Sequence, residues 1–382
     1  MILMTFIVIP FTALYISLLL LYKYGWFLQK KFVVKKNFEP RTSISVIVAA
    51  RNESANIEKC IHCILSQDYP SLLFELIIVD DCSTDDTVDI VSSISAPNLK
   101  LIKLADFLTE NETVVSYKKR ALTTGIMHST GSLVVTTDAD CWMSENWLRS
   151  IAAYYEEFSP EMIVAPVKFY VKSSLLHLFQ SLDFMTMQGI TTAIVRLNLG
   201  VMCNGANMAF SRKAFEAVGG YEGVDHLVSG DDYLLQLKIR NTFPGSIKYL
   251  KSSQAIVTTL PQQTWPEFFQ QRIRWASKSG RYKDSKMTVM LLLVYLFNCS
   301  IFSLALMSMV NSEWLLVLIQ ILVFKTVAEL FFLLPVAKFY STLAQLIIFP
   351  FLQPLHIVYI IVAGLLSRIG KFEWKSRTSI QH

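Results

Sequence analysis

Charged residues are scarce in this chain. They make up 17% of its 382 residues, whereas 53% are hydrophobic, which is too apolar for a typical soluble protein. Aspartate, glutamate, lysine and arginine are absent from three long stretches, 1–22, 287–312 and 339–367. About 20 apolar residues of helix are enough to cross the hydrocarbon core of a bilayer. This composition excludes an ordinary soluble enzyme and predicts an integral membrane protein.

The marks of a cleavable secretory signal are also missing. No basic residue precedes the first apolar stretch and no small-residue cleavage site follows it, so we expect an uncleaved anchor. Its basic flank lies downstream, at Lys23, Lys30, Lys31, Lys35 and Lys36. Because basic residues favour the cytoplasmic side of a membrane, this flank predicts an external N-terminus and a cytoplasmic domain after the anchor.

The C-terminal region has two unusual features. Residues 314–337 are apolar except for Lys325 and Glu329, which share one helical face and can neutralise each other within a span. A pair retained for packing or insertion is favoured here over a functional site. The last stretch contains Pro350 and Pro354, either of which can break a helix. If this stretch spans the membrane the basic tail lies outside, and if it folds back the tail stays inside; the sequence leaves both open. The tail carries Arg368, Lys371, Lys375 and Arg377.

Patterns typical of zinc, redox and nucleic-acid proteins are absent as well. Among six cysteines, Cys60 and Cys63 form a C-x-x-C pair without a second pair to complete a zinc site. Buried thiols in a reducing compartment are therefore expected. The net charge of +5 is modest and the basic residues lie beside the apolar stretches. This favours contact with lipid head groups over nucleic acid.

The central region, 37–285, contains nearly all the acidic residues and alternates β-rich runs with helical patterns. Strands alternating with helices predict a parallel sheet covered on both faces, which binds ligands beyond the carboxyl ends of its strands. No glycine-rich phosphate loop follows the first strand. The expected strands are 45–50, 73–81, 99–104 and 132–137, and the expected helices are 56–67, 86–94 and 118–129.

Polar residues stand at the ends of three of these strands. They occupy 50–53, 80–83 and 138–140, so we expect three acidic clusters at one edge of the sheet. Asp138 and Asp140 offer hard oxygen ligands for Mg²⁺ or Mn²⁺, and the small Ala139 leaves room for both to reach one ion. A D-x-D pair alone is also typical of solvated loop acids. Its place directly after an apolar strand favours the metal.

Seven motifs occur in order between residues 43 and 282. They are VIVAARNES (46–54), IIVDDCSTDDT (77–87), KKRAL (118–122), TTDADC (136–141), CNGANMAF (203–210), SGDD (229–232) and QRIRW (271–275). In this order the sequence resembles membrane-bound inverting glycosyltransferases of family 2, which have the α/β GT-A fold with N-terminal and C-terminal transmembrane helices. The resemblance extends to ceramide glucosyltransferase-like enzymes and, through Q-x-x-R-W, to cellulose and hyaluronan synthase-like enzymes.

The resemblance implies a role for each motif. Asp232 corresponds to the catalytic base; its neighbour Asp231, as a like charge, would make it a stronger base. Asp138 and Asp140 would hold the metal ion on the diphosphate. The donor would be bound by Ala50, Arg51, Glu53, Asp80, Asp81, Lys118 and Asp138. The acceptor or diphosphate would lie near Gln271, Arg274 and Trp275.

The sequence departs from the family pattern in three places. Cys82 stands where glycine is usual, Tyr117 where a glycine often precedes the lysine, and Asp231 where many relatives have glutamate. Separately, 171–198 has the spacing of an amphipathic helix, which would either pack in the core or lie on the membrane surface.

The sequence thus predicts an anchor at 1–30, a cytoplasmic glycosyltransferase domain at 31–285, and a C-terminal membrane region at 286–382. We expect transfer of a sugar from a UDP- or GDP-sugar to a lipid or lipid-linked acceptor at the cytoplasmic face, with Mg²⁺ or Mn²⁺. A processive polysaccharide synthase is the alternative. An inactive membrane scaffold would not need D-x-D, the SGDD acids and Q-x-x-R-W together, and a nucleotidyltransferase has no use for Q-x-x-R-W.

Overall fold

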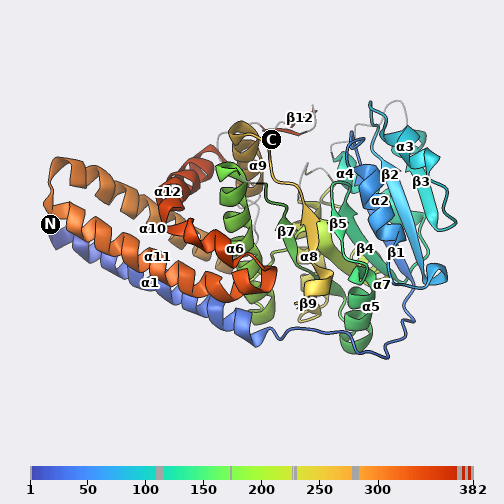
Figure 1. Cartoon of the computed structure of the whole chain (residues 1–382), viewed down its shortest axis with the longest axis horizontal. Coiled ribbons are helices and arrows are strands. Elements are labelled where there is room, and N and C mark those ends of the chain that lie inside the picture. The colour runs from blue at the N-terminus through green and yellow to red at the C-terminus, as the bar shows by residue number, and fades with distance from the viewer. Residues whose placement is uncertain are drawn as a thin grey trace. The chain divides into compact units, whose positions relative to one another are not determined.

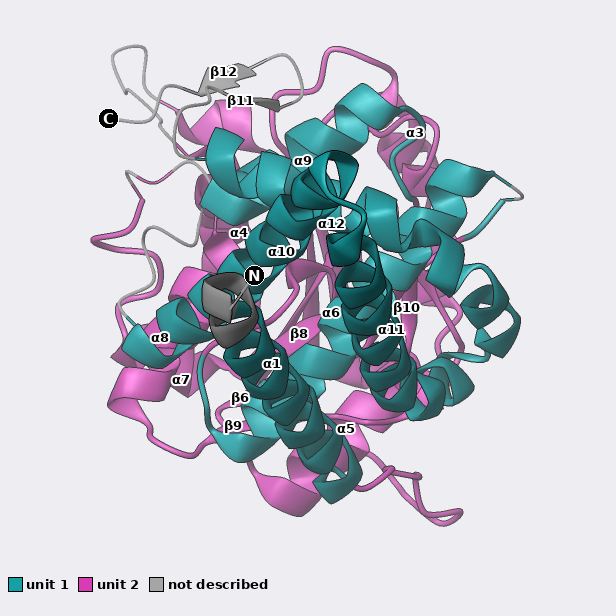
Figure 2. Cartoon of the chain, turned by 90° about the vertical axis from the view of Figure 1, so that its left-hand side faces the viewer, with its two compact units in different colours: residues 1–29, 171–200, 261–382 teal, residues 30–170, 201–260 magenta. Residues whose placement is uncertain are grey.

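The described chain divides into two compact units. The computed structural model describes residues 2–108, 116–172, 174–225, 227, 230–277, 284–367, 372–374 and 377–379. Figure 2 colours the units separately. The first, here called the helical unit, comprises Met1–Gln29, Val171–Gly200 and Pro261–His382. The second, here called the sheet unit, comprises Lys30–Tyr170 and Val201–Leu260.

This division differs from the expected domain boundaries at two places. Residues 171–200 and 261–285 were expected within the glycosyltransferase domain, whereas the structure assigns them to the helical unit. The reason is visible in helix α6 (Leu175–Leu197), which buries 15 of its 23 residues and packs against α1 (Ile2–Leu28) and α11 (Glu313–Tyr340). Of the two expectations for this helix, the structure favours core packing.

The sheet unit is built on a seven-stranded sheet with the order β3-β2-β1-β4-β8-β6-β9. The four strands expected from the first half of the chain, β1 to β4, are all parallel, as predicted. The second half adds β8, which runs antiparallel to β4 and β6. The bounds are β1 Ile44–Ala50, β2 Phe74–Asp80, β3 Leu99–Lys103, β4 Leu133–Asp138, β6 Met162–Val164, β8 Met208–Ser211 and β9 Ile247–Tyr249. A smaller sheet joins β5 Trp142–Met143, β10 Val257–Thr259 and β7 Val167–Phe169.

Buried branched side chains explain why these strands pair. In β1 and β2, Ile47, Ile77 and Val79 are fully buried in the core, and α4 packs over both strands. The helices of this unit are α2 Ile57–Leu65, α3 Thr87–Ser93, α4 Tyr117–Met127, α5 Trp147–Phe158, α7 Arg212–Ala217 and α8 Asp231–Thr242. Short 3₁₀ turns lie at Ser71–Leu73, Leu104–Phe107, Gly205–Asn207 and Ser253–Ala255. None of the six cysteines forms a disulfide; Cys60 is buried in α2, as expected, whereas Cys63 of the same pair is half-buried.

The helical unit contains three long helices that lie side by side, α1, α10 and α11 (Figure 1). Its elements besides α1, α6 and α11 are α9 Trp265–Ser277, α10 Ser285–Val310, a 3₁₀ turn at Leu343–Ile347, α12 Phe349–Leu366, and the strands β11 Phe372–Trp374 and β12 Arg377–Ser379. Four described helices are long and apolar enough to cross a membrane: Val8–Leu28, α10, α11 and α12. The tail residues Arg368, Lys371 and Lys375 lie outside the described residues.

The surface of α11 suits lipid contact. Six of its eight exposed large apolar side chains recur every three or four residues and therefore share one face of the helix. They are Leu316, Ile319, Val323, Val327, Phe331 and Leu334. A continuous exposed apolar face of this kind is unfavourable in water.

The two prolines of the last apolar stretch do not break its helix. Pro350 lies in the first turn of α12, where the missing N–H has no partner to lose, and Pro354 lies inside the helix, which continues to Leu366. The chain turns between Tyr340 and Phe349, before both prolines.

Candidate active site

The ends of three parallel strands bring the expected acidic clusters to one edge of the sheet. In register, Ala50 of β1 pairs with Asp80 of β2, and Ala49 pairs with Asp138 of β4. The two loops that follow β1 and β2 are also joined, because the Asp81 N–H donates to the Ala50 carbonyl at 2.7 Å. Arg51 Nη1 donates to the carbonyls of Asp81 and Cys82, at 2.8 and 2.9 Å. Part of the Arg51 guanidinium therefore fixes the backbone of this edge.

Two residues after these strands have left-handed backbone conformations. Asn52 has a φ of 50° and Cys82 a φ of 53°. Asparagine tolerates this region, and the Asn52 Oδ1 accepts from the Thr84 N–H at 2.8 Å. The sequence resemblance placed Cys82 where glycine is usual, and glycine is the residue that adopts this backbone conformation most easily.

Asp85 joins the loop after β1 to the start of α3 through hydrogen bonds, a role that the sequence did not predict. Its carboxylate accepts from the Ser54 N–H at 3.1 Å and from the Thr87 N–H and Oγ1 at 3.1 and 2.5 Å. Burial acts to raise the pKa of Asp85, but these hydrogen bonds outweigh it and lower the pKa to about 2. The Glu53 backbone N–H donates to Thr87 Oγ1 at 2.8 Å, so the hydroxyl that binds Asp85 also holds the Glu53 backbone.

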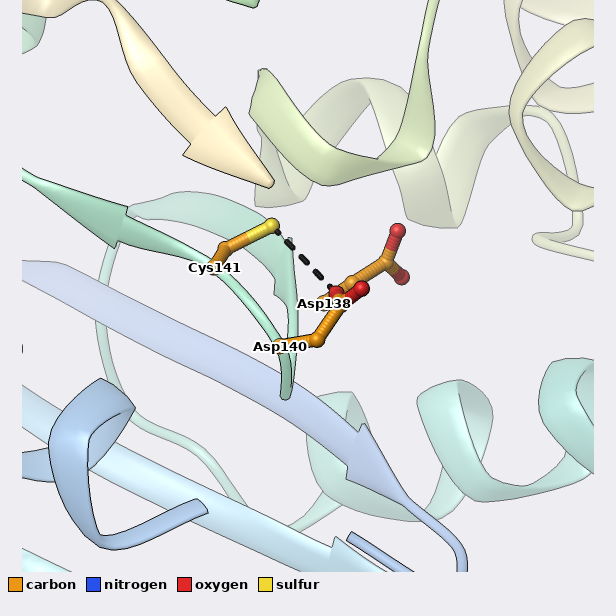
Figure 3. A group of neighbouring side chains, drawn as sticks. All are labelled: Asp138, Asp140 and Cys141. Atoms are coloured by element: carbon orange, nitrogen blue, oxygen red, sulfur yellow. Dashed lines mark hydrogen bonds between the residues drawn. The ribbon is translucent and has the colours of Figure 1, made fainter. Parts of the chain in front are cut away.

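Asp138 and Asp140 project to the same side of the loop that follows β4 (Figure 3). Ligand atoms of Asp138, Asp140 and Cys141 all lie within 4.8 Å of one another. Thr259 Oγ1 donates to Asp140 Oδ2 at 3.0 Å and so orients that carboxylate. Ala139 between the two acids is buried, as its small side chain permits.

The thiols beside these acids are neutral. Burial, followed by the charges of Asp140 and Asp138, raises the pKa of Cys141 well above its ordinary value, and burial does the same for the pKa of Cys60. Asp138 and Asp140 offer carboxylate oxygens, which are hard donors and fit Mg²⁺ or Mn²⁺ better than a thiophilic ion such as Zn²⁺.

Lys118, at the start of α4, joins the D-x-D acids to the SGDD acids. Its Nζ lies 2.8 Å from Asp138 Oδ1 and 3.5 Å from Asp231 Oδ2. Burial acts to lower the pKa of Lys118, but Asp138 and Asp231, with Asp232, raise it well above its ordinary value. Lys118 is therefore a cation placed between two anions from distant parts of the sequence. The arrangement also shows that Asp138 is oriented to receive a positive charge.

Asp231 and Asp232 form the first turn of α8, whose preceding Gly230 has a φ of 91°. A helix N-terminus stabilises carboxylates because its free N–H groups carry partial positive charge. Gly205 of the CNGANMAF motif faces both acids: a Cβ there would lie 3.4 Å from Asp231 Oδ2 and 3.7 Å from Asp232 Cβ. This motif therefore borders the acids, a role that its sequence alone did not reveal. Ser229 of SGDD lies outside the described residues.

The residues expected near the acceptor belong to the other unit. Gln271, Arg274 and Trp275 all lie on α9 of the helical unit and are partly exposed. The strand-end acids, Lys118 and the α8 acids thus form one group within the sheet unit.

Comparison with known proteins identifies the family. Residues 45–219 match glycosyl transferase family 2, and residues 133–363, more than half of the chain, match glycosyl transferase family group 2. The chain is also similar to a solved mannosyltransferase from Pyrobaculum calidifontis, in complex with GDP-Man and Mn²⁺, with a TM-score of 0.61 and 21% identity over 95% of this chain and 99% of that one. That likeness shows the fold.

Three curated relatives have related descriptions. Glycosyltransferase AglE of Haloferax volcanii is 29% identical over 50% of this chain and 58% of its own length. A poly-β-1,6-N-acetyl-D-glucosamine synthase of Staphylococcus epidermidis is 26% identical over 66% of this chain and 60% of its own length. A β-monoglucosyldiacylglycerol synthase of Synechocystis is 25% identical over 64% of this chain and 50% of its own length. The chain thus spans little more than half the length of these relatives. With the strand-end acids on a GT-A sheet, these matches place the chain in glycosyltransferase family 2.

Proposed function

We propose that this protein is an inverting glycosyltransferase that moves a sugar from a nucleoside-diphosphate donor to a lipid or lipid-linked acceptor at the cytoplasmic face of a membrane. The observation that carries the proposal is the position of Lys118 between Asp138 and Asp231. It brings the acids suited to a diphosphate–metal group and the acids suited to a base into one site.

The donor would occupy the edge of the sheet. Arg51, Glu53, Asp80 and Asp81 surround the ends of β1 and β2, where a base and ribose would bind, with the Ala50 backbone beneath them. Asp138 and Asp140 would hold Mg²⁺ or Mn²⁺, which when bound acts as a Lewis acid toward the leaving diphosphate. The similar mannosyltransferase, solved with GDP-Man and Mn²⁺, supports a donor and metal of these classes.

The acceptor hydroxyl needs a base. Lys118 holds Asp231, so we assign proton removal to Asp232 and the positioning of Lys118 to Asp231. Asp232 takes the proton as the hydroxyl oxygen attacks the anomeric carbon, and the bond from that carbon to the phosphate oxygen breaks. The nucleoside diphosphate leaves with the bonding electrons. The Lys118 ammonium lies beside Asp138 and would help to neutralise the negative charge of the departing diphosphate. One displacement from the opposite side inverts the sugar.

Two observations favour a lipid acceptor. Four described helices are capable of spanning a membrane, which is few for enclosing a growing polymer, and one relative is a β-monoglucosyldiacylglycerol synthase. The poly-N-acetylglucosamine synthase among the relatives supports the second candidate, a processive polysaccharide synthase. The lysines after α1 support a cytoplasmic sheet unit. Arg274 and Trp275 of α9 are proposed to contact the diphosphate and the acceptor.

Asp232→Asn tests the assignment of the base. We expect transfer to fall by about 10²- to 10⁴-fold, because an amide cannot accept the proton, while donor affinity changes by less than about 2-fold. Single-turnover transfer and nucleotide-sugar binding are measured on the same preparation. Asp231→Asn, in contrast, should weaken donor binding in addition to lowering transfer, because it removes one of the two carboxylates that hold Lys118.

The control is Asp89→Asn, which removes an exposed acid from the first turn of α3, away from these acids in the sequence, and should leave both quantities unchanged. If Asp232→Asn weakened donor binding strongly but kept the rate of transfer at saturating donor, Asp232 would be a donor ligand and not the base.

A further inference from the structure

A buried ion pair in the helical unit joins a residue of the Q-x-x-R-W motif to α6. Arg272, one of the two unspecified positions in that motif, is 2% exposed. Its Nε and Nη2 both lie 2.9 Å from Oδ2 of Asp183, which is on α6 and is also buried. Burying two charges is favourable only when they are paired and hydrogen-bonded, as they are here. Sequence reasoning gave neither residue a role.

Arg272 also touches two of the three motif residues that the sequence singled out. Its Nη1 donates to Gln271 Oε1 at 2.8 Å, and its guanidinium lies 4.2 Å from the centre of the Trp275 ring. The guanidinium also lies 4.9 Å from the centre of the Phe268 ring. A guanidinium over an indole face is an attractive and directional contact. The orientation of Trp275 therefore depends on where Arg272 is held.

α6 supplies the fixed side of this arrangement. Asp183 holds Arg272, and the next residue, Phe184, lies 6.0 Å from the Trp275 ring, centre to centre. Asp183 Oδ1 also lies 3.9 Å from His356 Nε2 of α12. One pair of residues on α6 thus positions the aromatic residue of α9.

We propose that Asp183 is a positioning residue which, through Arg272, fixes Gln271 and Trp275 in the orientation required for sugar transfer. The part of this proposal that concerns catalysis rests on the proposed function. The part that concerns the orientation of Trp275 does not.

The test uses the full chain in detergent and a matched set of variants. Asp183→Asn removes the negative charge and Asp183→Glu keeps it. Arg272→Lys keeps the positive charge but loses the planar guanidinium, whose Nε donates to Asp183 and whose Nη1 donates to Gln271. Ser181→Ala is the control: Ser181 is a buried polar residue of the same helix, and its Oγ donates to Gln345 Oε1 at 2.8 Å.

The first readout is the fluorescence of Trp275. Each variant is compared with its own Trp275→Phe derivative, so that the difference isolates one of the seven tryptophans. We expect Asp183→Asn and Arg272→Lys to increase acrylamide quenching of this difference signal about 2-fold or more, because Arg272 no longer covers the ring. Asp183→Glu should return it toward the wild-type value, and Ser181→Ala should leave it unchanged.

The second readout is transfer. Asp183→Asn and Arg272→Lys should lower kcat by about 10- to 100-fold, with the donor KM within about 2-fold, since a misplaced acceptor contact affects the rate more than donor binding. Ser181→Ala should change neither parameter.

The outcomes separate the two proposals. An unchanged Trp275 signal in folded Asp183→Asn and Arg272→Lys proteins would overturn the positioning role, and so would an equal loss of kcat in Ser181→Ala. If Asp183→Asn does not fold, Arg272→Lys decides the question. If the wild-type protein transfers no sugar, the proposed function fails while the fluorescence still reports on the contact.

Discussion

At residue 82 a cysteine adopts the left-handed backbone that glycine adopts most easily. We expect Cys82→Gly to keep activity and to leave the free energy of unfolding equal or higher by up to about 1 kcal/mol. Relief of backbone strain, about 1–2 kcal/mol, exceeds the about 0.4–1 kcal/mol that glycine adds to the entropy of the unfolded chain. Thermal unfolding of the purified variant measures the change.

Cys63→Gly is the matched control for that substitution. Cys63 lies inside α2, so glycine there should cost about 1 kcal/mol. A marked loss of stability in Cys82→Gly, comparable to that of the control, would mean that the cysteine side chain contributes more than the backbone strain costs.

Lys251 provides a pH-dependent contribution to stability. Burial, with the nearby charge of Lys31, lowers the pKa of Lys251 to about 7, whereas lysine in an unfolded chain titrates near 10.4. Between these two values the unfolded state binds a proton that the folded state lacks, so stability rises with pH across this window. The destabilising effect is complete below about pH 7.

The expected result is a rise in Tm of the wild-type protein from pH 7 to pH 9, relative to Lys251→Met. Subtracting the two curves removes the other titrating groups. Lys103→Met, at an exposed position of β3, controls for the loss of a lysine and should follow the wild type. Parallel curves for wild type and Lys251→Met would contradict the prediction.

At this scale the sequence predicted positions better than contacts. Asp80, Asp138 and Asp140 were expected at one edge because the carboxyl ends of parallel strands must meet there, and they do. The double pairing of Lys118 was not predictable, since Asp138 and Asp231 approach it only through tertiary packing. Arg272 was overlooked because a motif definition leaves its position unspecified.

Among the helices, α11 carries a charged pair within a membrane-capable segment. Lys325 Nζ lies 2.6 Å from Glu329 Oε1, as the i,i+4 spacing suggested. Two further partners were not foreseen: Tyr15 of α1 donates to Glu329 Oε1 at 2.5 Å, and Gln353 of α12 donates to Glu329 Oε2 at 2.5 Å while its Oε1 accepts from Lys325 Nζ at 2.5 Å. The pair therefore connects three helices, which supports its retention for packing.

A double-mutant cycle measures this connection. Lys325→Met alone should lower the free energy of unfolding by about 3–5 kcal/mol, because it leaves a buried carboxylate without its cation. Lys325→Met combined with Glu329→Gln should cost less than the sum of the single changes. Thermal unfolding in detergent gives the values.

Lys338→Met, at an exposed position in the last turn of α11, is the control and should cost less than about 0.5 kcal/mol. Additive single effects would show that the buried pair is not coupled.

Element types followed from local patterns, and their partners did not. The alternation of β-rich runs and helical patterns gave all of β1 to β4 and the helices between them. The antiparallel direction of β8 depends on the strands it joins, and no local signal encodes that. The sequence left open whether Pro350 or Pro354 breaks a helix; Pro350 lies in the first turn of α12 and Pro354 is accommodated inside it.

For the molecule as a whole, composition predicted a membrane protein, and the described part of the chain contains four helices long and apolar enough to cross a membrane. The division into units was harder to predict. α6 and α9 both belong to the helical unit, but residues 201–260 of the sheet unit separate them in the sequence. Apolar periodicity indicated that α6 buries a face, but it carried no information on which partner the face meets.

Transfer of label in isolated membranes tests the central claim most directly. Membranes containing the wild-type chain, Asp138→Asn or Asp232→Asn are incubated with labelled UDP- and GDP-sugars and Mn²⁺, and lipids are then extracted. We predict that wild-type membranes move label from one donor into an extractable lipid, and that either substitution or removal of the metal by chelation abolishes this. Label found only in a long polymer, or equal labelling of lipid by wild type and both variants, would contradict the account.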